Sequence, residues 1–265
     1  MPVSLDNILR ATREKVAAAK RTADLRDLER RAEKHIPRGF RRALQEKSNA
    51  GIAIIAELKK ASPSMGLIRP NFSPAELAKQ LESAGAAALS VLTDEEFFQG
   101  SLDNLSNASA VVKLPCLRKD FIIDDLQILE AKANSADAVL LIVAALTQGE
   151  LISLARAARS LELDVLCEVH DENELRRALD AGCDLIGVNT RDLRTFEVDP
   201  QTTFRLAELL PENVTRVAES GIRSAEDISR LRAAGYQAFL IGESLMRAQN
   251  PGGALRGLLA SRVTV

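Results

Sequence analysis

Short apolar runs alternate with longer amphipathic segments along most of this chain, and the alternation repeats eight times. The runs are rich in β-branched residues, and their apolar positions are consecutive rather than alternating. This is typical of strands buried on both faces of a parallel sheet. They occupy residues 52–60, 87–93, 114–121, 137–146, 164–170, 183–190, 215–220 and 238–244. The segments between them, such as SPAELAKQLESAG and SAEDISRLRAAG, have helical periodicity, open on a serine cap and close on a glycine.

Eight strand–helix units in roughly 215 residues predict a (β/α)8 TIM barrel. The alternative is an open doubly wound sheet, which usually carries a G-x-G-x-x-G turn after its first strand. Here the corresponding turn is KKASPS, which disfavours that fold. Residues 1–50 precede the first strand and are rich in Ala, Arg, Lys, Leu and Glu. We therefore expect an N-terminal helical extension (1–50) on one barrel domain that spans residues 1–265.

Charge and hydropathy exclude two classes of partner. The net charge is −2 and the sequence pI is near 5.9, so there is no electrostatic case for nucleic-acid binding. No apolar run approaches the ~18 residues that a membrane span needs, and the first residues carry charges where a signal peptide is apolar. We interpret the basic cluster of Arg38, Arg41 and Arg42, which lies between Glu33 and Glu46, as a solvated helix face.

Cysteine and histidine usage narrows the chemistry. Cys116, Cys167 and Cys183 lack C-x-x-C spacing and lie in or beside apolar runs, so we expect buried reduced thiols in a cytoplasmic protein. His35 and His170 are far apart in the sequence, which makes a metal site or a Ser-His-Asp triad improbable. We therefore expect metal-independent acid–base chemistry that rests on lysine and glutamate.

Polar side chains interrupt the apolar runs near their ends, where the strands of a barrel meet at the catalytic mouth. Glu57 and Lys59 are two residues apart and share a strand face. The other strand-end candidates are Lys119, Glu168, Asn189, Glu219 and Ser220, while the fourth strand adds apolar Leu140 and Ile142. A single such residue is equally well explained as a buried ion pair or a solvated strand end. Two lysines, three glutamates and an asparagine at one rim favour a catalytic site, because buried charges are costly unless paired.

Small residues follow the last two strands. Ser220-Gly221-Ile222 comes after the seventh strand and Gly242-Glu243-Ser244 after the eighth. Barrels often bind phosphate with backbone N–H groups of these two loops. Each glycine alone is equally explained as a turn, but the two together predict a phosphate site.

The chain resembles the indole-3-glycerol-phosphate synthase family. The matching segments are IAELKKASPSMG, TDEEFFQGSLDNL, LPCLRKDFIID, CEVH, GVNTRDL, VAESGI and IGESLMR, which cover strands one to eight in order. The resemblance implies that Lys119 is the general acid, with Glu168 as its acid–base partner. It also implies that Glu57, Lys59, Asn189 and Ser220 complete the catalytic group. Implied substrate and phosphate contacts are Lys59, Ser62, Phe98, Phe121, Leu140, Arg191, Glu219, Ser220, Gly221, Gly242 and Glu243. Glu243 stands where a small residue often occurs in the family, and its side chain would repel phosphate if it turned inward.

The resemblance implies a cofactor-free lyase of tryptophan biosynthesis. Its substrate would be 1-(2-carboxyphenylamino)-1-deoxyribulose 5-phosphate, closed to indole-3-glycerol phosphate with loss of CO2 and water. The rival is another phosphosugar barrel such as a phosphoribosylanthranilate isomerase, and the strand-end lysines argue against it. A non-catalytic α/β binding protein would not place charges at five separate strand ends. A monomer is expected, and the sequence leaves a homodimer open.

Overall fold

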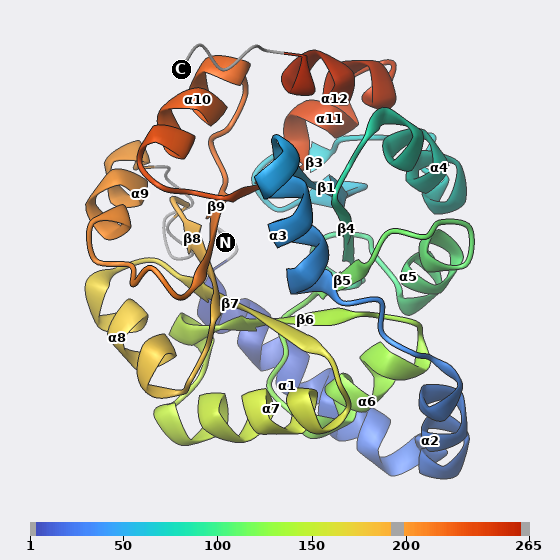
Figure 1. Ribbon diagram of the computed structural model, residues 1–265. Coiled ribbons are helices and arrows are strands. Elements are labelled where there is room, and N and C mark those ends of the chain that lie inside the picture. The colour runs from blue at the N-terminus through green and yellow to red at the C-terminus, as the bar shows by residue number, and fades with distance from the viewer. Residues whose placement is uncertain (1–3, 192–198, 261–265) are drawn as a thin grey trace.

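Eight parallel strands close into a barrel at the centre of the molecule (Figure 1). The computed structural model describes residues 4–191 and 199–260. The barrel strands are β1 (Ala53–Leu58), β4 (Ala88–Leu92), β5 (Cys116–Lys119), β6 (Ala138–Ile142), β7 (Asp164–Val169), β8 (Leu185–Asn189), β9 (Thr215–Glu219) and β10 (Ala238–Ile241). They run around the ring in the order β1-β10-β9-β8-β7-β6-β5-β4, and β4 pairs with β1 to close it. The predicted (β/α)8 barrel is confirmed.

Helices surround the barrel and return the chain from one strand to the next (Figure 1). They are α4 (Pro74–Ala84), α5 (Leu102–Ser109), α6 (Asp125–Ala133), α7 (Gln148–Ser160), α8 (Glu172–Asp180), α9 (Pro200–Ala207), α10 (Ala225–Ala233), α11 (Glu243–Arg247) and α12 (Pro251–Leu259). A 3-10 turn, η1 (Val143–Ala145), and a hairpin of β2 (Ala61–Ser62) and β3 (Gly66–Leu67) lie in loops. Ser224 opens α10 with a capping box, and Gly85 closes α4 in the left-handed region (φ 99°), as the sequence indicates.

Alternate residues of each strand pack into two different apolar clusters. Ala53 and Ile55 of β1 belong to the cluster inside the barrel, whereas Ile54 and Ala56 belong to the layer between strands and helices. All four side chains are fully buried. This explains why the strands are continuous apolar runs in the sequence, since both of their faces are covered.

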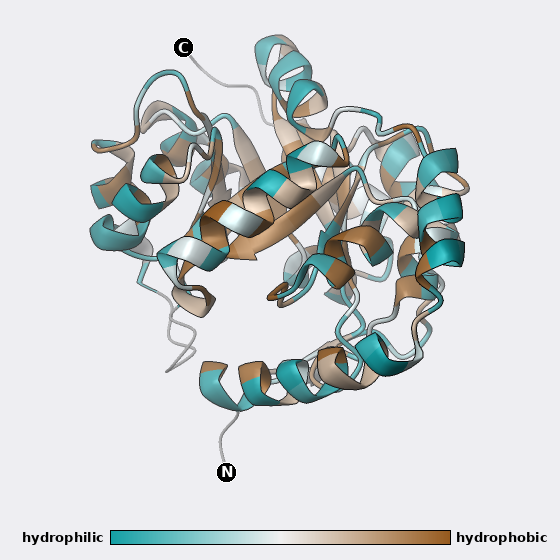
Figure 2. Ribbon diagram, turned by 90° about the horizontal axis from the view of Figure 1, so that it is seen from below, coloured by the Kyte–Doolittle hydropathy of each residue, from teal (hydrophilic) through white to brown (hydrophobic). Residues whose placement is uncertain are grey.

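The N-terminal extension packs against both ends of the barrel. It consists of α1 (Leu5–Thr22), α2 (Leu25–Lys34) and α3 (Phe40–Ala50). Figure 2 shows α1 lying across one end of the barrel, where Leu5 and Ile8 join the inside cluster. At the other end α3 contributes Phe40 and Leu44, which are fully buried in the same cluster. The extension is therefore part of the barrel core rather than an appendage.

The basic cluster of Arg38, Arg41 and Arg42 is not a solvated helix face, and that interpretation was wrong for two of its members. Arg38 lies before α3 and its Nη2 is 2.5 Å from Oδ2 of Asp137, a carboxylate with no exposed surface. Arg41 pairs with Asp184. Arg42 alone is largely exposed, at 71% of its side chain. The aspartates precede β6 and β8, 99 and 143 residues further along the chain, so the local sequence gives no sign of these pairs.

The remaining composition-based expectations concern cysteines and membranes. Cys116, Cys167 and Cys183 are free and buried, which confirms the prediction of buried thiols. Within the described ranges, no helix combines the length and the apolar character that crossing a membrane requires.

Candidate active site

A cavity of about 610 Å³ opens at the C-terminal ends of the barrel strands. Every site residue proposed from the sequence lines it, and together they come from all eight strands or the loops that follow them. These residues are Glu57, Lys59, Ser62, Phe98, Lys119, Phe121, Leu140, Glu168, Asn189, Arg191, Glu219, Ser220, Gly221, Gly242 and Glu243. The structure thus brings the whole set together, while the role of each member stays a prediction. Residues 192–193 of the GVNTRDL segment lie outside the described ranges.

Strand alternation explains why the polar candidates point into the barrel. Lys119 comes two residues after Leu117, and Glu168 comes two residues after Leu166; both leucines belong to the inside cluster. Arg118 points the other way, to the outer side against α6, where it is 3% exposed. The opposite directions of Arg118 and Lys119 are those that the sequence predicts.

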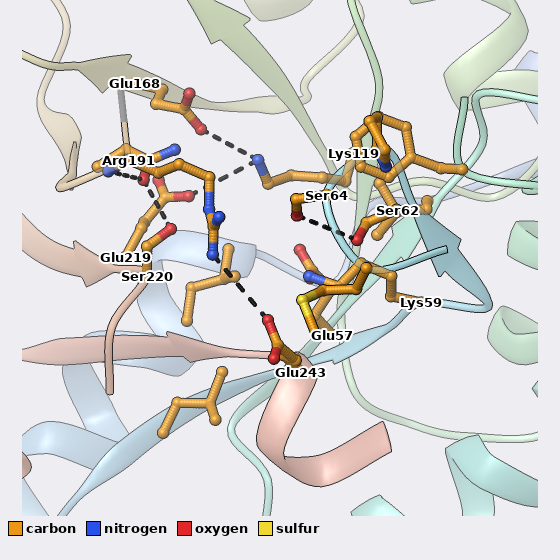
Figure 3. Close-up of a pocket in the computed structure, with 18 of the residues that line it drawn as sticks. Glu57, Lys59, Ser62, Ser64, Lys119, Glu168, Arg191, Glu219, Ser220 and Glu243 are labelled. Atoms are coloured by element: carbon orange, nitrogen blue, oxygen red, sulfur yellow. Dashed lines mark hydrogen bonds and ion pairs between the residues drawn. The ribbon is translucent and has the colours of Figure 1, made fainter. Parts of the chain in front are cut away.

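Lys119 is buried among carboxylates at the centre of the cavity (Figure 3). Its Nζ donates to Oε2 of Glu168 at 3.0 Å and lies 3.7 Å from Oε2 of Glu219. The two glutamate side chains are 1% and 2% exposed, and that of Lys119 is 14% exposed. One ammonium group therefore serves two carboxylates from which water is almost excluded.

Burial and mutual charge set the protonation of this cluster. Burial alone lowers the pKa of Lys119, but the carboxylates of Glu168, Glu219 and Glu57 together raise it above its usual value. Burial raises the pKa of Glu168, and the neighbouring Lys119 and His170 more than offset this, so Glu168 stays ionised. For Glu219, burial and the charge of Glu168 raise the pKa to about 8. At neutral pH the cluster thus holds an ammonium, a carboxylate and a carboxylic acid.

A second lysine–glutamate pair lies on the β1 side of the cavity. Nζ of Lys59 is 2.6 Å from Oε1 of Glu57, which is 4% exposed. β1 ends at Leu58, so Lys59 is the first residue of the following loop and still reaches the carboxylate two positions back. The pair places a second cation near the centre of the site.

Two glycines leave room for the buried carboxylates. A Cβ on Gly242 would lie 2.2 Å from Oε1 of Glu57, and a Cβ on Gly187 would lie 2.1 Å from Oε1 of Glu219. Any side chain at either position would therefore displace a candidate catalytic group. From the sequence, Gly242 is expected only to offer its N–H to phosphate, and no local pattern marks Gly187.

The loop after β9 has an unusual backbone. Ser220 and Gly221 both have positive φ, 60° and 73°, and such a conformation is uncommon for a serine. The Ser220 hydroxyl donates to Oδ1 of Asn189 at 2.7 Å. Strained residues of this kind cluster at functional sites, where the surroundings hold them in place.

Glu243 turns toward two arginines beside this loop. Its Oε2 lies 4.0 Å from Nη2 of Arg191 (Figure 3). Its Oε1 lies 3.5 Å from Nε of Arg247. Its side chain is 35% exposed and lines the cavity. The negative charge of Glu243 is thus offset by two cations, and this end of the cavity is suited to an anion.

The opposite wall of the cavity is apolar. The rings of Phe98 and Phe121 lie with centroids 6.3 Å apart and an interplanar angle of 39°. Leu140 continues this wall, and Leu5 and Ile8 of α1 add apolar surface from the N-terminal extension. A planar apolar group would be covered on this side of the site.

Several polar residues of the site are not expected from the sequence, and Asp94, Arg247 and His170 are three of them. Asp94 and Arg247 line the cavity, and Nε2 of His170 lies 3.3 Å from Oε1 of Glu168. The sequence disfavours a metal site or a Ser-His-Asp triad and gives His170 no role, so its contact with Glu168 is a feature that only the structure shows. Its place one residue after the strand CEV was a usable signal, since strand ends carry the site. Over the described residues, no group of three or more His, Cys, Asp or Glu could hold a metal ion.

Fold and site together define a (β/α)8-barrel enzyme whose acid–base groups are lysines and glutamates at the C-terminal mouth. Among solved structures, 3-hexulose-6-phosphate synthase shares this fold with a TM-score of 0.63 at 14% identity, over 79% of this chain and 99% of that one. KGPDC from Streptococcus mutans gives a TM-score of 0.60 at 12% identity, over 78% and 95%. At these identities the likeness shows the fold alone.

The sequence comparisons go further. The family model described as indole-3-glycerol phosphate synthase matches residues 5–258. An indole-3-glycerol phosphate synthase from Koribacter versatilis (strain Ellin345) is 61% identical over 98% of this chain and 100% of its own length. One from Burkholderia vietnamiensis (strain G4 / LMG 22486) is 50% identical over 95% and 97%. The chain belongs to the indole-3-glycerol phosphate synthase family, as its motifs indicate.

Proposed function

We propose that this chain converts 1-(2-carboxyphenylamino)-1-deoxyribulose 5-phosphate to indole-3-glycerol phosphate, releasing CO2 and water, in tryptophan biosynthesis. One observation carries the proposal: Lys119 lies between two buried carboxyl groups in a single cavity that has an apolar wall and a cationic end. The substrate has the matching three parts, an aromatic ring, a ketone and a phosphate. Membership of the family supports the same reaction.

The substrate is oriented by its two ends. Its phosphate binds the backbone after β9 and β10, at Gly221, Gly242 and Glu243, with the Ser220 hydroxyl and the nearby arginines adding donors. Ser62 and Lys59 reach the same end from the loop after β1. The aromatic ring packs between Phe98, Phe121 and Leu140.

Ring closure then takes place beside Lys119. The ring carbon that bears the carboxylate attacks the ketone carbon, and the ketone oxygen takes a proton from the ammonium group of Lys119 to become a hydroxyl. Attack leaves a positive charge conjugated to the anilino nitrogen. The bond to the carboxylate breaks, its electron pair restores the aromatic ring, and CO2 leaves. The substrate supplies its own electron sink, so this step requires no cofactor.

Dehydration uses the two carboxyl groups in opposite states. The new hydroxyl leaves as water with a proton from Glu219, whose pKa near 8 keeps it protonated at neutral pH. Glu168, which is ionised, takes the proton from the neighbouring carbon and completes the indole. Two further pairs fix the position of the reacting atoms. One is Asn189 with Ser220, joined by a 2.7 Å hydrogen bond, and the other is Glu57 with Lys59.

We also propose that the enzyme works as a monomer in the cytoplasm. The three free, buried cysteines are typical of a reducing compartment. Most of the large apolar side chains exposed on the described surface are scattered, with Met65 and Leu67 sharing the β2–β3 hairpin, as on many monomers. Size-exclusion chromatography with light scattering tests the oligomeric state, and a dimer at micromolar concentration would contradict it.

The activity is tested by adding the carboxyphenylamino substrate to the purified protein without any cofactor and recording indole fluorescence. The chain contains no tryptophan, so the protein adds little background. We expect fluorescence to rise with time, accompanied by release of CO2. Absence of product from this substrate, together with turnover of phosphoribosylanthranilate, would overturn the proposal in favour of an isomerase.

A further inference from the structure

His170 lies directly behind Glu168, at the end of β7, and connects it to α8. Nε2 of the imidazole is 3.3 Å from Oε1 of Glu168, and Nδ1 is 2.9 Å from Oε2 of Glu174. The backbone N–H of His170 donates to the same Glu174 oxygen at 2.8 Å. The imidazole is 14% exposed. Glu174 thus holds Nδ1 of a nearly buried histidine by a hydrogen bond, while Nε2 lies within ion-pair distance of Glu168 without a hydrogen bond to it.

The local sequence explains this arrangement. Asp171 is the N-cap of α8, and its side chain accepts from the backbone N–H of Glu174 in the first turn. Glu174 therefore reaches back over the helix start to the residue before the cap, which is His170. The histidine is held from the helix side, so its other nitrogen faces the strand end that carries Glu168.

The four side chains form a row of alternating charge: Glu174, His170, Glu168 and Lys119. Burial lowers the pKa of His170, but its contacts with Glu168 and Glu174 raise it to about 10, so the imidazole is cationic at neutral pH. Glu168 then has a cation on each side, Lys119 at 3.0 Å and His170 at 3.3 Å.

Glu219 differs from Glu168 in this respect. It shares Lys119, at the longer distance of 3.7 Å, and among the described residues its Oε1 accepts no hydrogen bond. The two carboxyl groups therefore compete for one ammonium, and a second cation stands beside Glu168. Other charged side chains near this row are Glu57 on β1 and, on α8, Asp171 and Arg177. Arg177 is bound to the carbonyl oxygens of Val143 and Leu146.

We propose that His170 is a positioning residue that makes Glu168 the ionised member of the Glu168–Glu219 pair and leaves the shared proton on Glu219. The inference rests on the proposed function, because it decides which carboxyl group acts as base and which as acid. Without the imidazolium, Lys119 would be the remaining cation beside both groups. The proton would then distribute between them, and part of the enzyme would hold each group in the wrong state.

A matched pair of variants tests this. In His170→Asn the cation is removed from Glu168. His35→Asn is the control, because Nε2 of His35 also lies 3.3 Å from a buried carboxylate, that of Asp137, and its side chain is likewise 14% exposed. His35 lies at the opposite end of the barrel from the cavity, where Asp137 precedes β6. A merely structural role for His170 would give the two variants the same behaviour.

Infrared titration of the substrate-free enzyme provides a readout that does not need activity. We expect the wild-type protein to lose a protonated-carboxyl band near pH 8, and Glu219→Gln to lack this band. In His170→Asn the midpoint should rise by about one pH unit, because the cation removed lies 3.3 Å from Glu168, which shares the proton with Glu219. An opposite charge within ~4–6 Å lowers a carboxyl pKa by about 1–3 units, and in a coupled pair this shift appears in the titration of the pair. His35→Asn should leave the midpoint unchanged.

Kinetics complete the test. We expect His170→Asn to lower kcat by about 10-fold or more with little change in KM, and to move the alkaline limb of the pH–rate profile in step with the infrared midpoint. His35→Asn should change kcat less than about twofold. If His170→Asn does not fold, Glu174→Gln replaces it, with a smaller shift in the same direction.

The outcomes separate the two proposals. An unmoved infrared midpoint in folded His170→Asn, or in Glu174→Gln if the former does not fold, overturns the role of His170 whatever the activity. If the infrared midpoint moves in His170→Asn but the wild-type protein does not turn over the substrate, the role of His170 stands and the proposed function is overturned.

Discussion

Gly187→Ala isolates the effect of displacing one carboxyl group. Gly187 lies on β8, and a Cβ there would be 2.1 Å from Oε1 and 3.2 Å from Cδ of Glu219, and 3.2 Å from Cδ1 of Leu166. The backbone of Gly187 has no positive φ, so alanine adopts it without strain. The barrel can therefore keep its strand pairing, and the side chain of Glu219 is the group that must yield.

The size of the effect follows from these distances. The Glu219 carboxyl must move by roughly 1 Å to restore an ordinary contact, and a displacement of about 1 Å in an active site can cost about 10²-fold in rate. We expect kcat to fall by about 10²-fold. Overpacking costs about 1–3 kcal/mol in unfolding free energy, which the lower backbone entropy of alanine offsets by about 0.5–1 kcal/mol. Most of the loss should thus appear in kcat rather than in stability.

Steady-state kinetics and urea unfolding measure the two quantities. Gly149→Ala is the matched control, because a Cβ on Gly149 has no neighbour within 4 Å. It should leave kcat unchanged and preserve or raise stability. A folded Gly187→Ala enzyme with kcat within about threefold of wild type would refute the reasoning, since the carboxyl position would then not matter to the reaction.

Three further predictions test the site and its scaffold. Lys119→Met should lower kcat by roughly 10³-fold, and Lys119→Arg should not restore it, because a guanidinium group is a weaker acid and is wider than an ammonium group. A folded Lys119→Met enzyme that keeps more than about a tenth of the wild-type kcat would mean that another residue is the general acid. Arg38→Met leaves the buried Asp137 carboxylate without its guanidinium partner, so the free energy of unfolding in urea should fall by about 3–5 kcal/mol while kcat at 25 °C stays near the wild-type value. An unchanged free energy of unfolding would mean that His35 alone compensates the charge of Asp137. Dialysis against a chelator should leave kcat unchanged, and a loss that a divalent cation reverses would contradict metal-independent chemistry.

The sequence by itself determines the barrel and the composition of its mouth. Both depend on local periodicity: continuous apolar runs predict strands covered on both faces, and amphipathic segments between them predict the outer helices. Alternation along one strand is equally local, so Lys119 and Arg118 can be assigned to opposite faces from the sequence alone. Because all strands of a barrel end at the same rim, Glu57, Lys119, Glu168 and Glu219 are predicted to converge.

The tertiary structure decides which charges pair and which are protonated. Arg38 and Asp137 are 99 residues apart and meet because α3 closes the end of the barrel, which no local pattern encodes. Glu168 and Glu219 occupy equivalent strand ends, yet one stays ionised and the other has a pKa raised to about 8. The difference comes from His170, set by the start of α8, and from the shorter distance of Lys119 to Glu168. Burial is nearly equal for the two groups, and it strengthens both effects because it weakens the solvation of every charge in the cavity. Distances between strands and exclusion of water exist only in the folded barrel, so the acid–base assignment depends on it.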